Sequence, residues 1–422
     1  MFNLQNLNWK KLVIAIAFTA FVVGAGYAIY FLFFKPTLPT VPEPVKPELG
    51  QLPSPKEGAP SVVTAPKPGA LVGPEAKPEK AITKIPAVAG KKIDEIAKGG
   101  ITKVATLNLK PTPVLTLDST GENAITYDKN EGRFYAIGAD TEKQPLNERV
   151  YKNVQKAAWS PKKEQAIFEF PDGSNVLYNF STDKQITLPK DWSDFSFNKS
   201  GNQIAFKDLN PNPEYQFLAV ANADGSGQKY IEYIGDDANN FKIDWSPNGK
   251  MLAQYKTGKS VNTSKLILLG QYGENFKSIT MNGYGIQTKW TPNGEKIAYS
   301  SYSVSSENKP QLYIVDASGD KIGYNHNSLK LSTWIDKCAL SGDKTLYCAV
   351  PKKMPEGAGL VPALADNTPD YIYKVDLETG AKIFVAEPEL DYTIDKMQVS
   401  EDESVLYFTD KSSQELHMIK LK

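Results

Sequence analysis

The distribution of apolar and polar residues divides the chain into three stretches. Residues 12–34 carry no charged side chain, residues 35–96 are rich in proline, and residues from about 101 onward alternate short apolar runs with turn formers. The first pattern predicts a membrane-spanning helix and the last predicts β-strands joined by tight turns. We therefore expect a cytoplasmic N-terminus (1–11), a transmembrane helix (12–34), a disordered linker (35–96) and a folded domain (97–422).

The segment Leu12–Phe34 has 23 residues and forms a helix of ~34 Å, enough for a hydrocarbon core of ~30 Å. Lys10 and Lys11 precede it, so the positive-inside rule places the N-terminus in the cytoplasm and the folded domain outside. The alternative is a cleaved signal peptide, whose apolar region normally has only ~7–15 residues. We expect an uncleaved anchor, because no clear cleavage site follows.

Small residues recur at four-residue spacing in this segment, at Ala20, Gly24 and Ala28. Such a stripe can pair two membrane helices. The simpler explanation is that membrane helices are rich in Gly and Ala, so oligomerisation stays open.

The linker contains 13 of the 29 prolines between Pro36 and Ile96. Proline lacks a backbone N–H and has a fixed φ, which prevents sheets and long helices. We expect a semi-extended spacer that ends in a short helix at "KKIDEIAKGG" (91–100).

One motif recurs seven times in the folded domain, most clearly as "DWSPNGKMLAQY" (244–255) and "KWTPNGEKIAYS" (289–300). Successive copies are 38 to 61 residues apart. A period of ~40–50 residues with several strands per unit is typical of a β-propeller. We predict an all-β propeller of four-stranded blades, with seven blades and with six or eight as alternatives. The position of Trp245 is filled, in chain order, by Leu117, Trp159, Phe197, Trp245, Trp290, Cys338 and Val399.

The motif has a physical explanation as a turn between two strands. In Ser246-Pro247-Asn248-Gly249, Pro pre-sets φ for a type I turn, and Gly supplies the left-handed residue that directs the chain into the next strand. The Trp before the turn provides a large apolar surface for packing. The structural repeat residues are Trp159, Pro161, Trp245, Pro247, Gly249, Trp290, Pro292 and Gly294.

The last repeat shows only three strands before the chain ends, whereas "ITKVATLNL" (101–109) is a spare strand before the first repeat. We expect this spare strand to complete the last blade and close the ring, which leaves only short, protected edges.

The residues "WSPNGK...LA" and "LYIVDASG" resemble the repeats of the TolB-type (WD40-like) β-propeller family, over about Ile101 to Lys422. The resemblance implies a binding platform of the cell envelope. This chain departs from the family in two ways: it has an apolar segment and a linker in place of the N-terminal α/β domain, and seven repeats in place of six.

We find no motif for catalysis, cofactor binding or metal binding, so we expect no catalytic residue, cofactor or metal ligand. G-x-S-x-G, the P-loop and the dinucleotide fingerprint are absent. "NADGSG", "VDASGD" and "VDLETG" recur at one repeat position, which favours structural turns over calcium loops. His326 and His417 have no evident triad partner and are expected to be structural.

The net charge and the two cysteines bear on the type of partner and on the compartment of the protein. Basic and acidic residues number 48 each, without the basic excess of a nucleic-acid binder. Cys338 and Cys348 flank one turn symmetrically, so they should face each other across a hairpin. Outside the cytoplasm a disulfide is plausible, with two buried free thiols as the alternative.

The loops predict which face binds a ligand. Turns between the first and second strands are short and similar, whereas loops between the second and third strands are long and varied, above all 351–370. Aromatic residues near the starts of first strands are candidates for this varied face or, alternatively, for the core: Trp192, Tyr284, Trp334 and Tyr392.

Our leading hypothesis is a single-pass, membrane-tethered, extracytoplasmic propeller that binds a protein or glycan of the cell envelope. The alternatives are a sugar or lactone enzyme with carboxylates or a metal in the central channel, and a structural subunit of an envelope complex.

Overall fold

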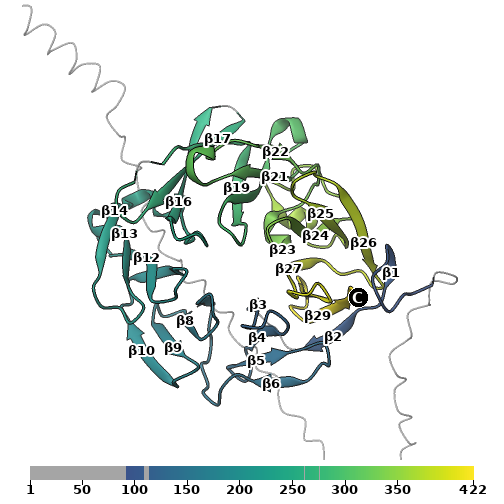
Figure 1. Ribbon diagram of the computed structural model, residues 1–422, viewed down its shortest axis with the longest axis horizontal. Coiled ribbons are helices and arrows are strands. Elements are labelled where there is room, and N and C mark those ends of the chain that lie inside the picture. Colours follow the sequence, from purple (N-terminus) through teal and green to yellow (C-terminus); the bar gives the residue numbers. More distant parts are fainter. Residues whose placement is uncertain (1–91, 109–113, 261, 275) are drawn as a thin grey trace, which may run out of the picture. The chain divides into compact units, whose positions relative to one another are not determined.

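The computed structural model describes residues 92–108, 114–260, 262–274 and 276–422. These residues form seven consecutive sheets arranged as a ring (Figure 1). Six sheets have four strands and one has five. The predicted seven-bladed propeller is therefore confirmed.

In each blade the strands are called A to D from the channel outward, and consecutive strands pair antiparallel. Blade 1 contains β3 (Leu115–Leu117), β4 (Ala124–Asp128), β5 (Arg133–Ile137) and β6 (Lys143–Pro145). Blade 2 contains β7 (Lys156–Trp159), β8 (Gln165–Glu169), β9 (Asn175–Asn179) and β10 (Lys184–Leu188). Blade 3 contains β11 (Trp192–Phe197), β12 (Gln203–Leu209), β13 (Gln216–Asn222) and β14 (Lys229–Tyr233). Blade 4 contains β15 (Phe241–Ile243), β16 (Met251–Ser260), β17 (Thr263–Gly270) and β18 (Ile279–Asn282).

The remaining three blades follow the same order. Blade 5 contains β19 (Tyr284–Trp290), β20 (Lys296–Tyr302), β21 (Gln311–Asp316) and β22 (Asn327–Ser328). Blade 6 contains β23 (Cys338–Ser341), β24 (Thr345–Pro351), β25 (Asp370–Asp376), β26 (Lys382–Pro388) and, at its outer edge, β1 (Gly100–Thr102). Blade 7 contains β27 (Ile394–Val399), β28 (Val405–Asp410), β29 (Leu416–Lys420) and β2 (Ala105–Asn108). Short 3₁₀ turns lie between strands: η2 (Pro213–Tyr215), η3 (Gly235–Asn240), η4 (Val304–Ser306), η5 (Gly319–Lys321), η6 (Ile335–Lys337) and η7 (Pro362–Ala365).

The B strands are apolar on both faces because each blade is covered by a neighbour on either side. All residues of β4 and β28 are buried, whereas the outer strands β6 and β14 are mostly exposed. The described residues contain seven apolar clusters, one at each junction between adjacent blades. The core is therefore a ring of inter-blade layers rather than one central mass.

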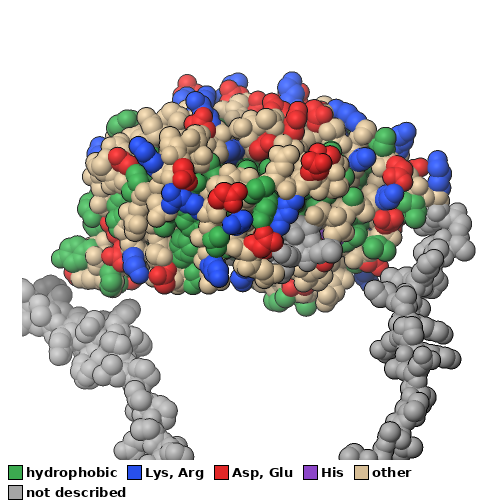
Figure 2. Space-filling view, turned by 90° about the horizontal axis from the view of Figure 1, so that it is seen from below, with side chains coloured by type: hydrophobic (Ala, Val, Ile, Leu, Met, Phe, Trp, Pro, Cys, Tyr) green, Lys and Arg blue, Asp and Glu red, His purple; other side chains and the backbone are tan. Residues whose placement is uncertain are grey.

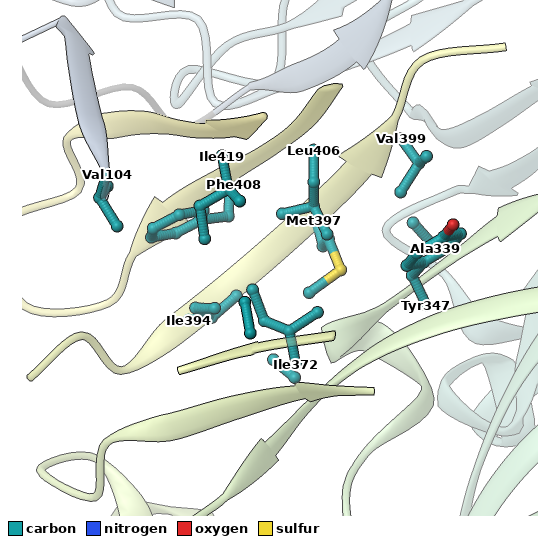
Figure 3. Packing of buried hydrophobic residues seen from close by; sticks show 12 residues of the cluster. Val104, Ala339, Tyr347, Ile372, Ile394, Met397, Val399, Leu406, Phe408 and Ile419 are labelled. Atoms are coloured by element: carbon teal, nitrogen blue, oxygen red, sulfur yellow. The ribbon is translucent and has the colours of Figure 1, made fainter. Parts of the chain in front are cut away.

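The N-terminal strand closes the ring as predicted. β2 pairs antiparallel with β29, and His417 contacts Thr106 across this pair with Nδ1 and Oγ1 3.1 Å apart. Val104, just before β2, packs beside Phe408 and Ile419 in the layer between blades 6 and 7 (Figure 3). β1 adds an unpredicted parallel fifth strand to β26.

The turns between A and B strands have the predicted geometry. Gly249 N–H donates to Ser246 O over 2.8 Å, and Gly294 N–H donates to Thr291 O over the same distance. Each of the seven A–B turns contains a left-handed residue with φ between 56° and 79°, which opens the turn in blade 6 (Gly342) and lies near its end in the others. It is Gly in five blades, and Lys163 and Glu403 in the other two.

Two expectations from the sequence are wrong. Residues 92–100 form no helix; instead Asp94 bridges to Thr102, which ties this segment to the propeller. In blade 6, Leu340 rather than Cys338 occupies the position of Trp245, because Leu340 pairs with Leu346 beside the turn while Cys338 pairs with Cys348 farther along. The sixth turn is one residue shorter than the others, which misaligned the repeat.

The predicted transmembrane segment, its Ala20, Gly24 and Ala28 stripe, and most of the linker lie outside the described residues. Within the described part of the chain, no helix has the length and apolar character needed to cross a membrane.

Removal of β1 and β2 should open the ring. A chain starting at residue 109 loses the strand that covers β29 and the buried Val104, whose burial alone contributes about 1.5–3 kcal/mol. We expect its free energy of unfolding to fall by several kcal/mol and its exposed β29 edge to promote aggregation. A chain starting at residue 92 is the control and should unfold like the full chain. Equal unfolding temperatures of the two truncations, measured by circular dichroism, would contradict this role.

Two glycines in equivalent turns should differ in their tolerance of alanine. Gly249 has φ +79° and open space around a Cβ, so Gly249→Ala should cost about 1–2 kcal/mol from backbone strain alone. At Gly294, φ is +70° and a Cβ would lie 2.6 Å from the backbone N of Asn248. We expect Gly294→Ala to cost clearly more in urea unfolding. If the two variants lose the same stability, the contact between neighbouring turns is unimportant.

Candidate functional site: a groove on the loop face

The B–C loops and the D-to-A connections of the blades share one face, here called the loop face; the A–B and C–D turns form the turn face. On the loop face of blades 5 to 7 lie two adjoining cavities of about 200 and 340 Å³. They share Gln287, Trp334 and Pro362, and together they are called the loop-face groove. Its other lining residues include Asp336, Lys337, Asp366, Asp395 and Lys411 in the first cavity and Tyr302, Pro310 and Leu360 in the second.

Trp334 lies at the centre of the groove and lines both cavities. It is half-buried, between the fully buried Thr333 and Ile335. The hydroxyl of Thr333 donates to Ala349 O over 2.6 Å, which fixes this segment to β24. The indole is thus presented from a rigid backbone, as an anchor residue for a ligand would be.

A buried ion pair forms part of the groove wall. Lys337 Nζ lies 2.7 and 2.8 Å from the two carboxylate oxygens of Asp370, and Asp370 Oδ2 also accepts from Ile394 N–H over 2.7 Å. Burial raises the pKa of Asp370 to about 6, against the lowering effect of Lys337, and burial also lowers the pKa of Lys337. The pair fixes η6 to the starts of β25 and β27.

A second, partly exposed ion pair lies near the first. Lys411 Nζ lies 2.5 Å from Asp366 Oδ1. Asp336 and Asp395 line the same cavity. The first cavity therefore offers both charges to a ligand, together with the amide of Gln287.

The 351–370 loop forms one side of the groove and is attached to blade 5. Gly357 N–H donates to Glu307 O over 3.0 Å, and Gly359 N–H donates to Asn308 O over 2.7 Å. A Cβ at Gly359 would lie 2.4 Å from Tyr302 Cβ, so only glycine permits this approach. Four exposed aliphatic residues stand on this loop and the neighbouring one: Val304 (71% exposed), Leu360 (57%), Val361 (53%) and Leu364 (53%).

The four aromatic candidates have different positions. Only Trp334 lines the groove. Trp192 is 4% exposed and stacks on Phe206 with ring centroids 3.8 Å apart, so it belongs to the core between blades 2 and 3. Tyr284 is half-buried beside the second cavity, and its hydroxyl accepts from Asn262 N–H over 2.7 Å. Tyr392 packs against Phe408 and His417.

The charged groove residues were not among the sequence candidates. Lys337 and Asp370 are 33 residues apart, and nothing in the local pattern of either distinguishes it from a surface charge. The length of the 351–370 loop was the one usable signal for Asp366 and Pro362.

The cysteines and the acidic turns have structural positions. Cys338 and Cys348 are direct partners on β23 and β24, and their sulfurs form a disulfide. Asp224 Oδ1 accepts from Ser226 N–H over 2.9 Å, and Asp376 Oδ1 accepts from Glu378 N–H over 3.0 Å, as expected for capped turns. Across the described ranges, no group of three or more His, Cys, Asp or Glu side chains is arranged to hold a metal ion.

A larger hollow of about 790 Å³ opens on the turn face, lined by A–B turns of several blades. Its acids already serve those turns: Asp402 Oδ1 accepts from Ser400 Oγ (2.7 Å) and Ser404 N–H (2.9 Å), which lowers the pKa of Asp402 to about 2. The loop-face groove has an aromatic anchor, Trp334, whereas no aromatic residue is among the lining residues of this hollow. We therefore regard the groove as the candidate site.

The side of the propeller seen in Figure 2 has no large patch of charges of one sign. In the edge-on view of Figure 2, basic and acidic side chains are interspersed with hydrophobic ones. On this view of the surface, a patch for a polyanion such as nucleic acid is not evident.

Comparisons with known proteins support the fold. No protein-family model and no curated protein matches this chain. The chain is similar to the solved structure of an oligogalacturonate lyase in complex with manganese, at 13% identity and TM-score 0.53, with 76% of this chain and 93% of that chain covered. It is also similar to a β-propeller domain from Myceliophteria thermophila (9% identity, TM-score 0.49, 76% and 100% covered) and to an oligogalacturonate lyase from Vibrio parahaemolyticus (10%, 0.46, 76% and 93%). At 13% identity the likeness to the first of these structures shows a shared propeller fold alone, and the TolB-type assignment stays a prediction.

Loss of one partner of the buried pair should destabilise the propeller. Lys337→Met leaves Asp370 buried without its cation, which typically costs about 3–5 kcal/mol. The double variant Lys337→Met/Asp370→Asn should lose less than the sum of the single variants, because Asn still accepts from Ile394 N–H. Lys344→Met, which breaks the exposed pair with Glu378, is the matched control and should change urea unfolding little. A Lys337→Met variant as stable as the control would show that the pair is dispensable.

Proposed function

We propose that this protein is a membrane-tethered, extracytoplasmic β-propeller that binds a segment of a partner protein of the cell envelope in the loop-face groove. The observation that supports it most directly is the position of Trp334, a rigidly held indole that lines both cavities. The propeller supplies the rigid scaffold, and the varied loops supply the recognition surface.

The rim of the groove favours a protein ligand over a glycan. The rim carries four aliphatic residues that are each more than half exposed: Val304, Leu360, Val361 and Leu364. The cavities beside them are lined by Trp334 and by charged side chains. A polar oligosaccharide would gain little from aliphatic contacts, whereas an apolar peptide side chain would bury them. The charges of Lys411 and Asp336 then serve for orientation and specificity.

The proposed extracytoplasmic location rests on the sequence prediction, and the disulfide supports it. The apolar segment and the lysines before it predict that the propeller lies outside the cytoplasm. The Cys338–Cys348 bridge suits that side, since disulfides persist in oxidising compartments.

The enzyme alternative has weaker support. Glycan hydrolysis requires two suitably placed carboxylates free to exchange protons. In the channel, Asp194 is paired with Lys207 and Asp244 with Lys242, so these acids are not a facing pair of free carboxylates. A structural-subunit role would depend on the Ala20, Gly24 and Ala28 stripe, which lies outside the described residues.

The test is capture of envelope proteins on the purified chain, with two altered baits. Trp334→Ala and a variant in which residues 358–364 are replaced by a short Gly-Ser linker should each retain less of the specific partner, by about thirtyfold for a hot-spot tryptophan. Tyr324→Ala removes an aromatic that is more exposed (61%), in the C–D region of blade 5, and should leave capture unchanged. Circular dichroism checks that all baits are folded.

Equal capture by all baits would show that the groove is not the binding site. Capture that depends on Tyr324 rather than Trp334 would move the site to the turn face.

A further inference from the structure

A separate cavity of about 540 Å³ opens between blades 3 and 4. Its lining residues come from the end of β14, from η3 and from β15, β16 and β17 on the neighbouring blade (Figure 1). None of the described residues that line it belongs to the loop-face groove. It is called the blade 3–4 cavity, and its two sides differ in chemistry.

One wall of the cavity is an apolar surface of blade 4 that blade 3 covers only in part. Along β17, residues on the side of blade 5 are buried, whereas Ile267 and Leu269, on the side of blade 3, are half-buried. Tyr255 is the direct partner of Ile267 in the sheet and is also half-buried. The outer strand of blade 3, β14, is mostly exposed. An aromatic ring and two aliphatic side chains therefore form this wall.

The aromatic ring of the wall is held at two points. Tyr255 stacks on Phe241, with ring centroids 4.5 Å apart and planes inclined by 25°. Its hydroxyl donates to Asp237 Oδ2 over 3.3 Å, which links the ring to η3. The stack with Phe241 uses one face of the phenol, so the second face is the one that a ligand in the cavity can contact. The ring is therefore oriented before a ligand binds.

The other side of the cavity is acidic. Glu232, Asp236 and Asp237 line it, all three are exposed, and the described lining contains no lysine or arginine. Glu232 is the direct partner of Leu218, which packs in the apolar layer between blades 3 and 4, so its side chain lies on the side of blade 4. Lys265, on the same side of β17 as the apolar wall, forms no ion pair with these acids within the described ranges. Carboxylates beside an apolar wall favour a ligand that combines a cation with an apolar stem.

We propose that the blade 3–4 cavity binds the side chain of an arginine carried by a segment of a partner protein. A guanidinium is planar, so it stacks on an aromatic face and forms two parallel hydrogen bonds with a carboxylate. The Tyr255 ring and the three acids supply both kinds of partner. The methylene stem of an arginine covers apolar surface, which Ile267 and Leu269 provide here.

The exposure of the acids favours a side chain over a free small molecule. Sites for small molecules usually enclose most of their ligand. Here the acids are exposed at the junction of two blades, so a polypeptide that lies across the opening inserts one side chain and leaves its other residues outside. The assignment does not rest on the loop-face groove, because neither Trp334 nor the 351–370 loop lines this cavity.

The experiment uses the full-length chain in detergent and three acetylated, amidated pentapeptides: Ala-Ala-Arg-Ala-Ala, the same peptide with citrulline in place of arginine, and the same peptide with lysine. Citrulline has the shape of arginine but a neutral urea group, so it isolates the contribution of the charge. Binding is measured by ligand-observed NMR titration at neutral pH and constant ionic strength.

Two variants alter the cavity. Glu232→Gln/Asp236→Asn/Asp237→Asn removes the three charges, and the amide introduced at position 237 still accepts from the hydroxyl of Tyr255. Tyr255→Leu removes the ring and keeps an apolar side chain. Circular dichroism checks that each variant is folded.

The matched control is Glu142→Gln/Glu164→Gln/Glu295→Gln, which removes three exposed carboxylates on blades 1, 2 and 5. It changes the net charge by the same amount as the acid variant of the cavity. A general attraction between a basic peptide and the protein would therefore fall equally in both.

We expect the arginine peptide to bind the wild type, and the citrulline peptide to bind about tenfold more weakly because its charge-assisted hydrogen bonds are lost. The lysine peptide should bind several-fold more weakly, because an ammonium neither stacks nor pairs with a carboxylate through two parallel bonds. For the arginine peptide, the acid variant should lose about tenfold in affinity and Tyr255→Leu about threefold to tenfold, whereas the control should bind as the wild type does.

The proposal is overturned if the arginine and citrulline peptides bind the wild type equally, or if the acid variant binds the arginine peptide as well as the control does. Equal binding of the lysine peptide would overturn the choice of arginine. Partner capture that depends on Trp334 tests the groove alone, so either proposal can fail while the other stands.

Discussion

The pairing of β2 with β29 is the contact on which the rest of the ring depends. It joins residues more than 300 positions apart, since Thr106 and His417 are separated by 311 residues. The same N-terminal segment also pairs with blade 6 through β1, and Gly99 N–H donates to Val385 O over 2.9 Å. Residues 97–108 therefore hold the last two blades together, and every apolar layer between blades relies on this closure, because an open ring would expose the two faces at the break.

Closure of the ring protects the edges of the first and last blades, but a row of backbone N–H and C=O groups still faces the channel. In several blades these groups are met by side chains of the preceding blade. Glu169 accepts from Asp194 N–H, Asp370 accepts from Ile394 N–H, and Lys256 donates to Ile286 O. Buried backbone groups require such partners. Charged side chains are thus drawn into the channel for a structural reason, because they supply the partners that these backbone groups need.

The sequence predicted the fold more completely than the site, for a physical reason. The turn residues Pro247 and Gly249 act within four positions, so their conformational preferences can be read directly. Trp334 and Trp192 have similar local surroundings, yet one lines a groove and the other stacks in the core, because their exposure depends on loops from other blades. The Lys337–Asp370 pair could not be predicted either, because a contact between residues 33 positions apart leaves no local sequence pattern. The repeat also misled at Cys338, where a turn one residue shorter shifted the alignment.

Blade 6 has the longest B–C loop, and it also has the most additional stabilising contacts. It has a fifth strand, a disulfide between its A and B strands, and a buried ion pair at its loop-face end. Ordering a long loop costs conformational entropy, and a ligand that must order it binds less tightly. The cross-links fix the strands from which the 351–370 loop departs, and the hydrogen bonds of Gly357 and Gly359 fix its middle to blade 5. Much of the ordering cost is therefore met in folding, so the groove beside Trp334 is largely formed before a partner arrives.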